Sequence, residues 1–257
     1  MGIDLFYNEK VFACICIYFK EGYMGLIVAK DIYKDYQVGE VSLRALSDLN
    51  FEIEPASFLS FVGPSGSGKT TLLNLIGCLD IPTGGSLTIA GTDVLSLDRK
   101  ERAAFRGRHM GFIFQDFNLI PVLTVYENIE YPLLMVQNVP SEERRRRVLS
   151  LLESVEMMEQ KDKYPDQISG GQKQRVAVAR ALVTEPELVL ADEPTANLDS
   201  KTAYMIIDLM KVMKEKSGTT FIFSTHDPKI VGAAEILYTL EDGTIVDRKE
   251  TGGNGHV

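Results

Sequence analysis

The hydrophobic residues of this chain alternate between strand-like and helical spacing. Short apolar runs bounded by turn residues predict strands at residues 26–32, 49–53, 58–62, 86–90, 110–114, 188–191 and 219–224. Longer stretches with apolar residues three or four positions apart predict helices at residues 69–79, 124–158, 170–184 and 200–216, with a fresh helix start at residues 140–143. Two further strands are expected on either side of Asp242 and Gly243. Because strands alternate with helices, we expect an α/β fold with a parallel sheet.

The same pattern indicates how the chain is divided. We expect one domain over residues 24–248, interrupted by a helical insert at about residues 116–168, and a flexible tail over residues 249–257. Residues 1–23 have no turn signal or period that connects them to this domain. We therefore expect an N-terminal extension that is disordered or not translated, with the native protein beginning at Met24. The alternative is a real appendage, such as a short amphipathic contact with a membrane.

The composition is that of an average globular protein, with 257 residues, 45% hydrophobic and 25% charged. A net charge of −9 counts against a nucleic-acid partner, which usually requires a basic surplus.

Cys14, Cys16 and Cys78 have no metal-ligand or disulfide spacing and predict reduced thiols in a cytosolic protein. The apolar run 11–19 is shorter than the roughly 18–20 residues that cross a bilayer. The basic run 144–147 predicts a solvated helix face paired with glutamates, and lipid contact is the alternative.

A glycine-rich segment, GPSGSGKT at residues 63–70, matches the phosphate-loop pattern GxxxxGK[ST]. Backbone N–H groups of such a turn, together with the N-terminus of the following helix, bind phosphate oxygens. Lys69 is expected on the β- and γ-phosphates, and the Thr70 hydroxyl on Mg²⁺. An incidental glycine-rich turn is disfavoured because an apolar strand precedes the segment and a helix follows it. The predicted ATP-binding residues are Gly63, Pro64, Ser65, Gly66, Ser67, Gly68, Lys69, Thr70 and Thr71.

The predicted strand 188–191 leads into two adjacent carboxylates, Asp192 and Glu193. Asp192 is expected to hold Mg²⁺ through its water shell. Glu193 is expected to orient and deprotonate the attacking water as a general base. Adjacent acids at a strand end are common on protein surfaces, so this signal gains its weight from the phosphate loop upstream.

The segment ISGGQ at residues 168–172 resembles LSGGQ, the sequence that identifies ABC ATPases. Ser-Gly-Gly is also typical of a helix N-cap followed by flexible glycines. Over about residues 25–248, the chain resembles the nucleotide-binding subunits of ABC transporters. The resemblance implies a RecA-like P-loop ATPase core with an antiparallel β-subdomain and an inserted helical subdomain. It also implies a head-to-tail dimer with a second copy, in which the contacts to the partner's ATP come from Ser169, Gly170, Gly171 and Gln172.

The resemblance extends to four more positions. It implies that Gln115 contacts Mg²⁺ and the water, that His226 contacts the γ-phosphate, and that Asp199 lies at the dimer interface. It also implies that Tyr36 stacks on adenine, with Tyr33 as the competing candidate. Each position has an ordinary structural alternative as well. These alternatives are an exposed loop residue for Gln115, a structural histidine for His226, a helix N-cap for Asp199 and strand packing for both tyrosines.

Within the family, one branch resembles the chain most. It contains the lipoprotein-releasing (LolD-like) and macrolide-export (MacB-like) ATPases, and the stretches that carry the resemblance are residues 36–39, 76–80, 111–121 and 192–199. This implies a subunit that uses ATP and Mg²⁺ to energise export or lipoprotein release. Its partner would be a separate permease with four membrane helices and a large extracytoplasmic domain. Its expected location is peripheral, at the cytoplasmic face of the inner membrane.

Two other functions compete with transport. One is a soluble ABC ATPase that acts on ribosomes or DNA, and the other is a non-hydrolysing, division-associated partner. The translation type carries two ATPase domains, whereas 257 residues accommodate one. The presence of Glu193 and His226 counts against an inactive site.

The first prediction concerns the N-terminal extension. Deleting residues 1–23 should leave the melting temperature and the ATPase rate unchanged, because the predicted fold begins at about Met24. Thermal unfolding and phosphate release, each compared with the full chain, measure both. A large loss of thermal stability would show that these residues pack into the core.

Overall fold

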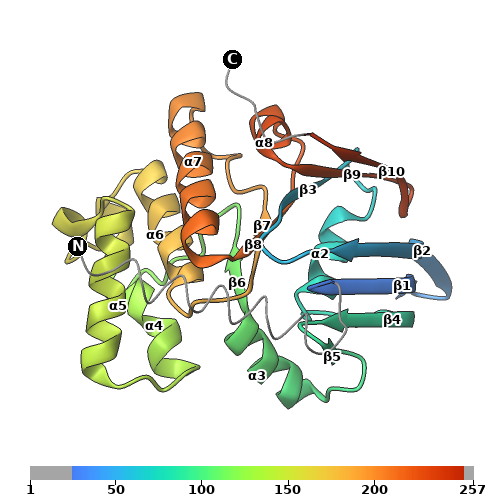
Figure 1. The fold of residues 1–257 in the computed structure, drawn as a ribbon, viewed down its shortest axis with the longest axis horizontal. Helices are drawn as coiled ribbons and strands as arrows, with labels where there is room; N and C mark the ends of the chain where they lie inside the picture. Colours follow the sequence, from blue (N-terminus) through green and yellow to red (C-terminus); the bar gives the residue numbers. More distant parts are fainter. Residues whose placement is uncertain (1–24, 252–257) are drawn as a thin grey trace.

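The structure of the chain, a computed structural model, describes residues 25–251 and has a six-stranded sheet at its centre (Figure 1). The strand order is β10–β9–β3–β8–β7–β6, and all neighbours are parallel except β10 and β9, which are antiparallel. The inner strands β3, β7 and β8 are almost wholly buried, which explains their continuous apolar runs. The predicted α/β fold is confirmed. The strands are β3 (Phe58–Val62), β6 (Met110–Ile113), β7 (Leu188–Asp192), β8 (Thr220–Ser224), β9 (Ile236–Glu241) and β10 (Thr244–Glu250).

A four-stranded antiparallel sheet lies beside the central one, at the right of Figure 1. Its order is β2–β1–β4–β5, and the strands are β1 (Ile27–Val38), β2 (Val41–Ile53), β4 (Gly84–Ile89) and β5 (Thr92–Asp93). The sequence predicts only part of β1 and β2, because both strands continue through polar or exposed positions. The antiparallel β-subdomain implied by the resemblance is therefore present.

Apolar side chains pack on both faces of the central sheet, because successive strand residues point to opposite faces. On one face, Leu59 and Ile222 join a buried cluster that includes the antiparallel sheet. On the other face, Phe58 and Phe221 belong to a second cluster. The first cluster includes α2 (Lys69–Ile76), and the second includes residues of α6 (Gly170–Leu182), α7 (Ser200–Ser217) and α8 (Pro228–Ala233).

The predicted helical insert consists of two main helices, α4 (Val125–Met135) and α5 (Ser141–Ser154). They pack against α6 in a third buried cluster, which contains Ile129, Leu152 and Val176. The chain then reaches α6 through two short 3₁₀ turns, Met158–Gln160 and Pro165–Gln167. The domain limits and the insert bounds of about 116–168 stay predictions.

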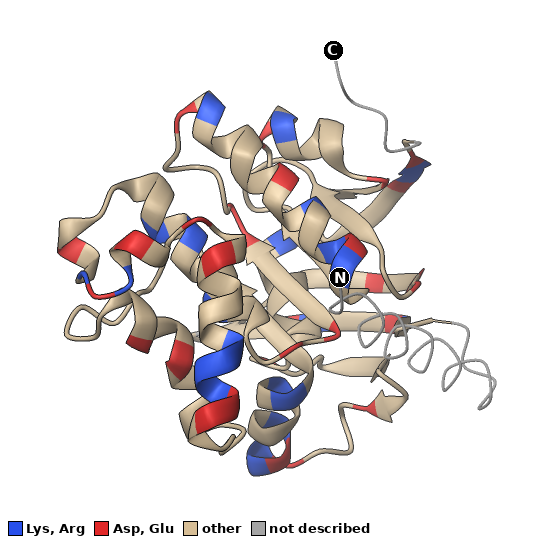
Figure 2. Ribbon diagram, turned by 60° about the vertical axis from the view of Figure 1, so that its left-hand side comes forward, with Lys and Arg blue, Asp and Glu red and all other residues tan. Residues whose placement is uncertain are grey.

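Three of the four arginines in the basic run on α5 pair with glutamates, as the sequence predicts. Arg144 lies 2.9 Å from Glu130 of α4, and Arg146 and Arg147 each lie 2.7 Å from Glu143. Hydrogen bonds from Arg146 and Arg147 lower the pKa of Glu143 to about 2. Figure 2 shows basic and acidic residues intermixed along the helices. These arginines therefore stabilise the insert rather than form a free basic patch.

One core helix, α3 (Arg99–His109), is missing from the sequence-based expectation. It buries one residue, Phe105, so it has no apolar period. Its start is stabilised by a capping box between Asp98 and Glu101. Within the described part of the chain, no helix combines the length and apolar character that a membrane span requires.

The expectations about the two termini concern mainly residues 1–24 and 252–257, which lie outside the described range. The predicted start at Met24 is among them. At the other end, β10 extends to Glu250, so the strand includes the first two residues of the predicted tail over 249–257.

Candidate nucleotide-binding site

The phosphate loop connects the end of β3 to the start of α2. Lys69 closes it, because its Nζ donates to the carbonyl oxygens of Gly63 at 2.8 Å and Pro64 at 2.9 Å. The positive charge is thereby held at the loop. A Cβ on Gly63 would lie 2.1 Å from the Leu240 carbonyl oxygen and 2.9 Å from the Ser67 hydroxyl, so the turn requires glycine there. The side chain of Ser67 is buried within the turn, whereas Pro64, Ser65 and Gly66 are exposed.

The N-terminus of α2 has backbone groups suited to bind an anion. Its N-cap, Gly68, has a left-handed conformation with φ 99°, and no side chain in the described region caps the helix. The N–H groups of the first turn have no partner within a helix, and the helix dipole favours negative charge at this end. A Cβ on Gly68 would lie 2.6 Å from Leu46 of β2, so the loop packs directly on the antiparallel sheet. These features fit a bound phosphate chain.

Asp192 ends β7 at the same edge of the sheet as the loop. Its Oδ2 lies 3.5 Å from the Thr70 hydroxyl. The two strands β3 and β7 are separated by β8, and all three are parallel, so their carboxyl ends face the same side. Mg²⁺ prefers oxygen ligands, and a carboxylate with a hydroxyl at this separation fits one shared ion.

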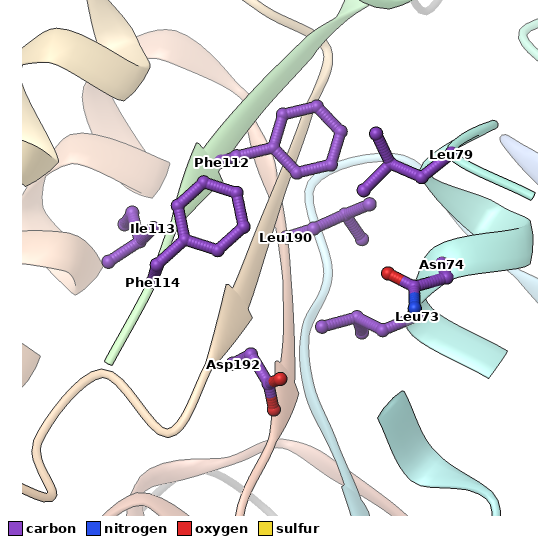
Figure 3. A pocket seen from close by; sticks show the side chains of 8 residues that line it. All are labelled: Leu73, Asn74, Leu79, Phe112, Ile113, Phe114, Leu190 and Asp192. Atoms are coloured by element: carbon purple, nitrogen blue, oxygen red, sulfur yellow. The ribbon is translucent and has the colours of Figure 1, made fainter. Parts of the chain in front are cut away.

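A small cavity of about 30 Å³ lies beside Asp192, between α2 and strands β6 and β7 (Figure 3). It has room for about one water molecule, so a nucleotide does not fit inside it. The predicted nucleotide site therefore lies outside this cavity. The cavity walls are mostly apolar and comprise Leu73, Asn74, Leu79, Phe112, Ile113, Phe114, Leu190 and Asp192.

Glu193 turns away from the direction of β7. Its backbone has φ 46°, an uncommon value for a residue with a side chain. Its Oε2 accepts a hydrogen bond from the Thr225 hydroxyl at 2.7 Å, and its Oε1 lies 2.6 Å from His226 Nδ1. The His226 side chain is 80% exposed, whereas Thr225 is fully buried. The structure thus brings Glu193 and His226 together, and Thr225 is a contact that the sequence analysis missed.

Gln115 lies in the loop after β6, with an exposed side chain. Its carbonyl oxygen accepts a hydrogen bond from Asn197 Nδ2 at 3.0 Å, which links this loop to the one after β7. Arg180 of α6 supports the same loop, because its guanidinium donates to the carbonyl oxygens of Phe117 and Asn118 at 2.8 and 2.5 Å. Burial lowers the pKa of Arg180. The supporting role of Arg180 has no sequence signal.

Ser169 and Asp199 are helix N-caps, as their structural interpretation predicts. The Ser169 hydroxyl accepts from the Gln172 N–H at 3.3 Å, and Gln172 Oε1 accepts from the Ser169 N–H at 2.9 Å. Asp199 accepts from the N–H and the hydroxyl of Thr202, which lowers the pKa of Asp199. Ser169, Gly170 and Asp199 are exposed. Among the described residues, no hydrogen bond joins Ser169 to the phosphate loop, so the structure does not bring the signature segment and the loop together within one chain.

The α6 start lies close to α7. A Cβ on Gly171 would lie 2.5 Å from the methyl group of Thr202, one turn after the Asp199 cap. Glycine at this position therefore allows the two helix starts to approach each other.

Tyr36 and Tyr33 both lie on β1 but have different surroundings. The Tyr33 ring packs on Gly84 and has the Arg44 guanidinium 4.6 Å from its centroid. The Tyr36 hydroxyl donates to Asp80 Oδ2 at 2.9 Å. Burial, and after it this hydrogen bond, raises the pKa of the Tyr36 phenol. Tyr33 is thus engaged in packing, which favours Tyr36 as the candidate for base stacking.

Comparison with known proteins identifies the family. The sequence model described as ABC transporter matches residues 46–196. The macrolide export ATP-binding/permease protein MacB of Syntrophobacter fumaroxidans is 43% identical over 223 residues, which cover 86% of this chain and 31% of that protein. The ABC transporter ATP-binding protein MJ0796 of Methanocaldococcus jannaschii is 45% identical, with 88% of this chain and 97% of that protein covered.

A solved structure supports the same relationship. It is described as a dimeric, post-hydrolysis state of MJ0796 bound to ADP and Pi, with a TM-score of 0.80, 42% identity and coverage of 87% of this chain and 98% of that one. The resemblance to the branch that includes the macrolide-export proteins is confirmed. The matched residues 46–196 include the phosphate loop, the signature segment and both carboxylates at the end of β7. The chain belongs to the ABC transporter family and contains its ATPase domain.

Proposed function

We propose that this chain is the ATP-hydrolysing subunit of a transporter whose membrane-spanning part is a separate permease. The observation that carries the proposal is the convergence of the phosphate loop, Asp192 and the Glu193–His226 pair at one edge of the central sheet. The MacB protein is named as both ATP-binding and permease, and this chain spans 31% of its length. MJ0796, which the chain spans almost completely, is named as an ATP-binding protein alone.

The phosphate loop, residues 63–71, binds the triphosphate of ATP. Lys69 contacts the β- and γ-phosphates, and the N–H groups of the loop and of the first turn of α2 bind their oxygens. Thr70, Gln115 and Asp192 are the residues that would hold Mg²⁺. When bound, this ion supplies positive charge against the charge that develops on the transferred phosphoryl group.

Glu193 acts as the general base for the attacking water. Its carboxylate is oriented by the Thr225 hydroxyl and by His226, so it is restricted before the water is bound. His226 is exposed on its other side, where it contacts the γ-phosphate. Gln115 orients the water from the opposite loop.

A second copy of the chain completes the site in a head-to-tail dimer. Support comes from the dimeric structures described for MJ0796 and from the exposure of Ser169 and Gly170 here. The exposed start of α6 would place its N–H groups and the Ser169 hydroxyl on the partner's γ-phosphate. Ser169, Gly170, Gly171 and Gln172 would make this contact, and Asp199 would lie at the same interface.

The permease docks in a groove of about 400 Å³ bordered by α3, β6, α4 and α6. Asn118 and Arg180 line the groove, and Arg180 donates to the Asn118 carbonyl oxygen in the loop after Gln115. A partner seated there therefore contacts the loop next to the γ-phosphate. The rim at the end of α4 is apolar and exposed, with Met135 at 62% and Val136 at 52%. Exposed apolar patches of this kind mark protein contacts.

The partner is a permease of four membrane helices with a large extracytoplasmic domain, and the complex serves export or lipoprotein release. The ATPase subunits would lie at the cytoplasmic face of the inner membrane. The name of the MacB relative supports export together with a permease. The helix number, the extracytoplasmic domain, lipoprotein release and the location are proposed from the resemblance of the sequence to this branch.

Glu193→Gln should retain ATP binding and lose turnover by at least about 100-fold, because the amide does not accept the proton of the attacking water. It should also form an ATP-dependent dimer that is stable during size-exclusion chromatography. Glu153→Gln, which changes an exposed carboxylate on α5, is the matched control and should behave as the unmodified chain. Unchanged turnover of Glu193→Gln would remove Glu193 from the role of base.

Ser169→Arg should prevent the ATP-dependent dimer while each monomer still binds nucleotide. The change also removes a helix cap, at a cost of about 1 kcal/mol in stability, which thermal unfolding measures. Lys69→Ala should instead weaken nucleotide binding in the monomer, by removing the charge at the phosphates. Ser150→Arg on the exposed face of α5 controls for the added charge. Equal loss of monomer binding in Ser169→Arg and Lys69→Ala would indicate a site built within one chain.

Cysteine crosslinking tests the permease. Cys14 and Cys16 are first replaced by serine. Cys78 can stay, because burial raises the pKa of its thiol to about 11 and makes it unreactive. In purified membranes, Asn118→Cys and Val136→Cys should then crosslink to an integral membrane protein. Val246→Cys, on the exposed side of β10, should not. Crosslinks from the groove to ribosomal or DNA-associated proteins alone would replace the transporter assignment with the soluble alternative.

A further inference from the structure

The segment that follows α2 is fastened to β1 by one carboxylate. Asp80 Oδ2 accepts a hydrogen bond from the Tyr36 hydroxyl at 2.9 Å, and Asp80 Oδ1 accepts one from the Lys34 ammonium at 2.7 Å. The N–H of Ile81 also donates to Oδ1 at 2.7 Å. Each oxygen of this carboxylate therefore has a defined donor.

Lys34 is unusual among the charged residues because it is buried, with 8% of its surface exposed. Its ammonium also donates to the Ile81 carbonyl oxygen at 2.8 Å and lies 4.8 Å from the centroid of the Tyr36 ring. Burial alone would raise the pKa of Asp80, but the hydrogen bonds from Lys34, Ile81 and Tyr36 outweigh it and lower this pKa. The buried ammonium is thus matched by an ionised carboxylate, as a buried charge requires.

Two further hydrogen bonds join β1 to the segment that follows α2. The N–H of Thr83 donates to the Tyr33 carbonyl oxygen at 2.9 Å, and the N–H of Asp35 donates to the Thr83 hydroxyl at 2.9 Å. Asp80 follows the last turn of α2, and the first residue of α2 is Lys69 of the phosphate loop. The position of the Tyr36 ring relative to the loop is therefore set through α2 and Asp80, and also by the Thr71 side chain, which interacts with the Tyr36 hydroxyl.

We propose that Asp80 and Lys34 are positioning residues that hold the Tyr36 ring as a stacking surface for the base of the bound nucleotide. Lys34 covers one face of the ring, so the base lies on the other. A ring fixed relative to the phosphate loop binds base and triphosphate together without losing freedom of its own on binding. The inference rests on the proposed ATPase function and on the stacking role that the resemblance implies for Tyr36, and it adds the two residues that position the ring.

The test separates base binding from phosphate binding. Steady-state hydrolysis gives KM and kcat for ATP, and inorganic tripolyphosphate, which has no base, serves as a competitive inhibitor. Tyr36→Phe keeps the ring but removes its hydroxyl. Asp80→Asn removes the charge that pairs with Lys34. Each should raise the KM for ATP by about tenfold, the scale of a weakened stacking contact, with kcat within about twofold and the tripolyphosphate inhibition constant unchanged.

A double variant and a matched control sharpen the test. If Asp80 acts through the Tyr36 hydroxyl, Tyr36→Phe combined with Asp80→Asn should raise the KM no more than the stronger single change. Tyr33→Phe, on the same strand, should leave the KM unchanged. Thermal unfolding of Asp80→Asn checks that this variant is folded. If Asp80→Asn does not fold, Tyr36→Phe still tests the inference, because it retains the Asp80–Lys34 pair.

Two results would overturn the inference while leaving the ATPase assignment intact. One is an unaltered KM for ATP in both Tyr36→Phe and Asp80→Asn, while turnover is still lost when Lys69 is replaced. The other is an equal rise in the ATP KM and the tripolyphosphate inhibition constant, which would show that the change acts on the phosphate loop. Absence of Lys69-dependent turnover in the unmodified chain would instead remove the proposed function itself.

Discussion

The parallel pairing of β3 and β7 with β8 between them is the constraint on which the site depends. It brings residues far apart in the sequence to one edge, because parallel strands end on the same side of a sheet. The left-handed backbone of Glu193 then gives the two neighbouring carboxylates different surroundings. Asp192 faces Thr70 and the loop, whereas Glu193 turns to Thr225 and His226. One strand end can therefore supply both a metal ligand and a proton acceptor.

The helix α6 connects this edge to the insert, because it is buried on two sides. Val178 belongs to the cluster on the central sheet and Val176 to the cluster of α4 and α5. Arg180 on the same helix holds the loop after β6, and Asn197 ties that loop to the one after β7. Coupling along this route requires an element with two arrangements. The exposed hydrogen bond of Asn197 is a contact that breaks at low cost, since such bonds contribute only about 1 kcal/mol net.

The sequence predicts best what depends on local pattern. Strands buried on both faces appear as apolar runs, and the phosphate loop is a contiguous motif between a strand and a helix. The helix α3 is not predicted, because its single buried residue, Phe105, creates no hydrophobic period. Asp98 and Glu101 do have the capping-box spacing. The contacts of Thr225, Arg180 and Asp80 depend on strand order and register, which a pattern of hydrophobic residues does not specify. The predicted site residues follow from motifs and from the family resemblance, whereas the residues that orient them depend on the three-dimensional arrangement.

The two ends of the proposed nucleotide site belong to different sheets, and α2 is what fixes their separation. This helix has eight residues, so it is about 12 Å long. Four of them, Leu72, Leu73, Leu75 and Ile76, are buried in the cluster that joins both sheets. Its first turn carries the groups proposed to bind phosphate, and its last turn leads to Asp80 and through it to Tyr36. Because close-packed cores resist small displacements, the base end and the phosphate end move as one body, and a change in the packing of α2 alters both at once.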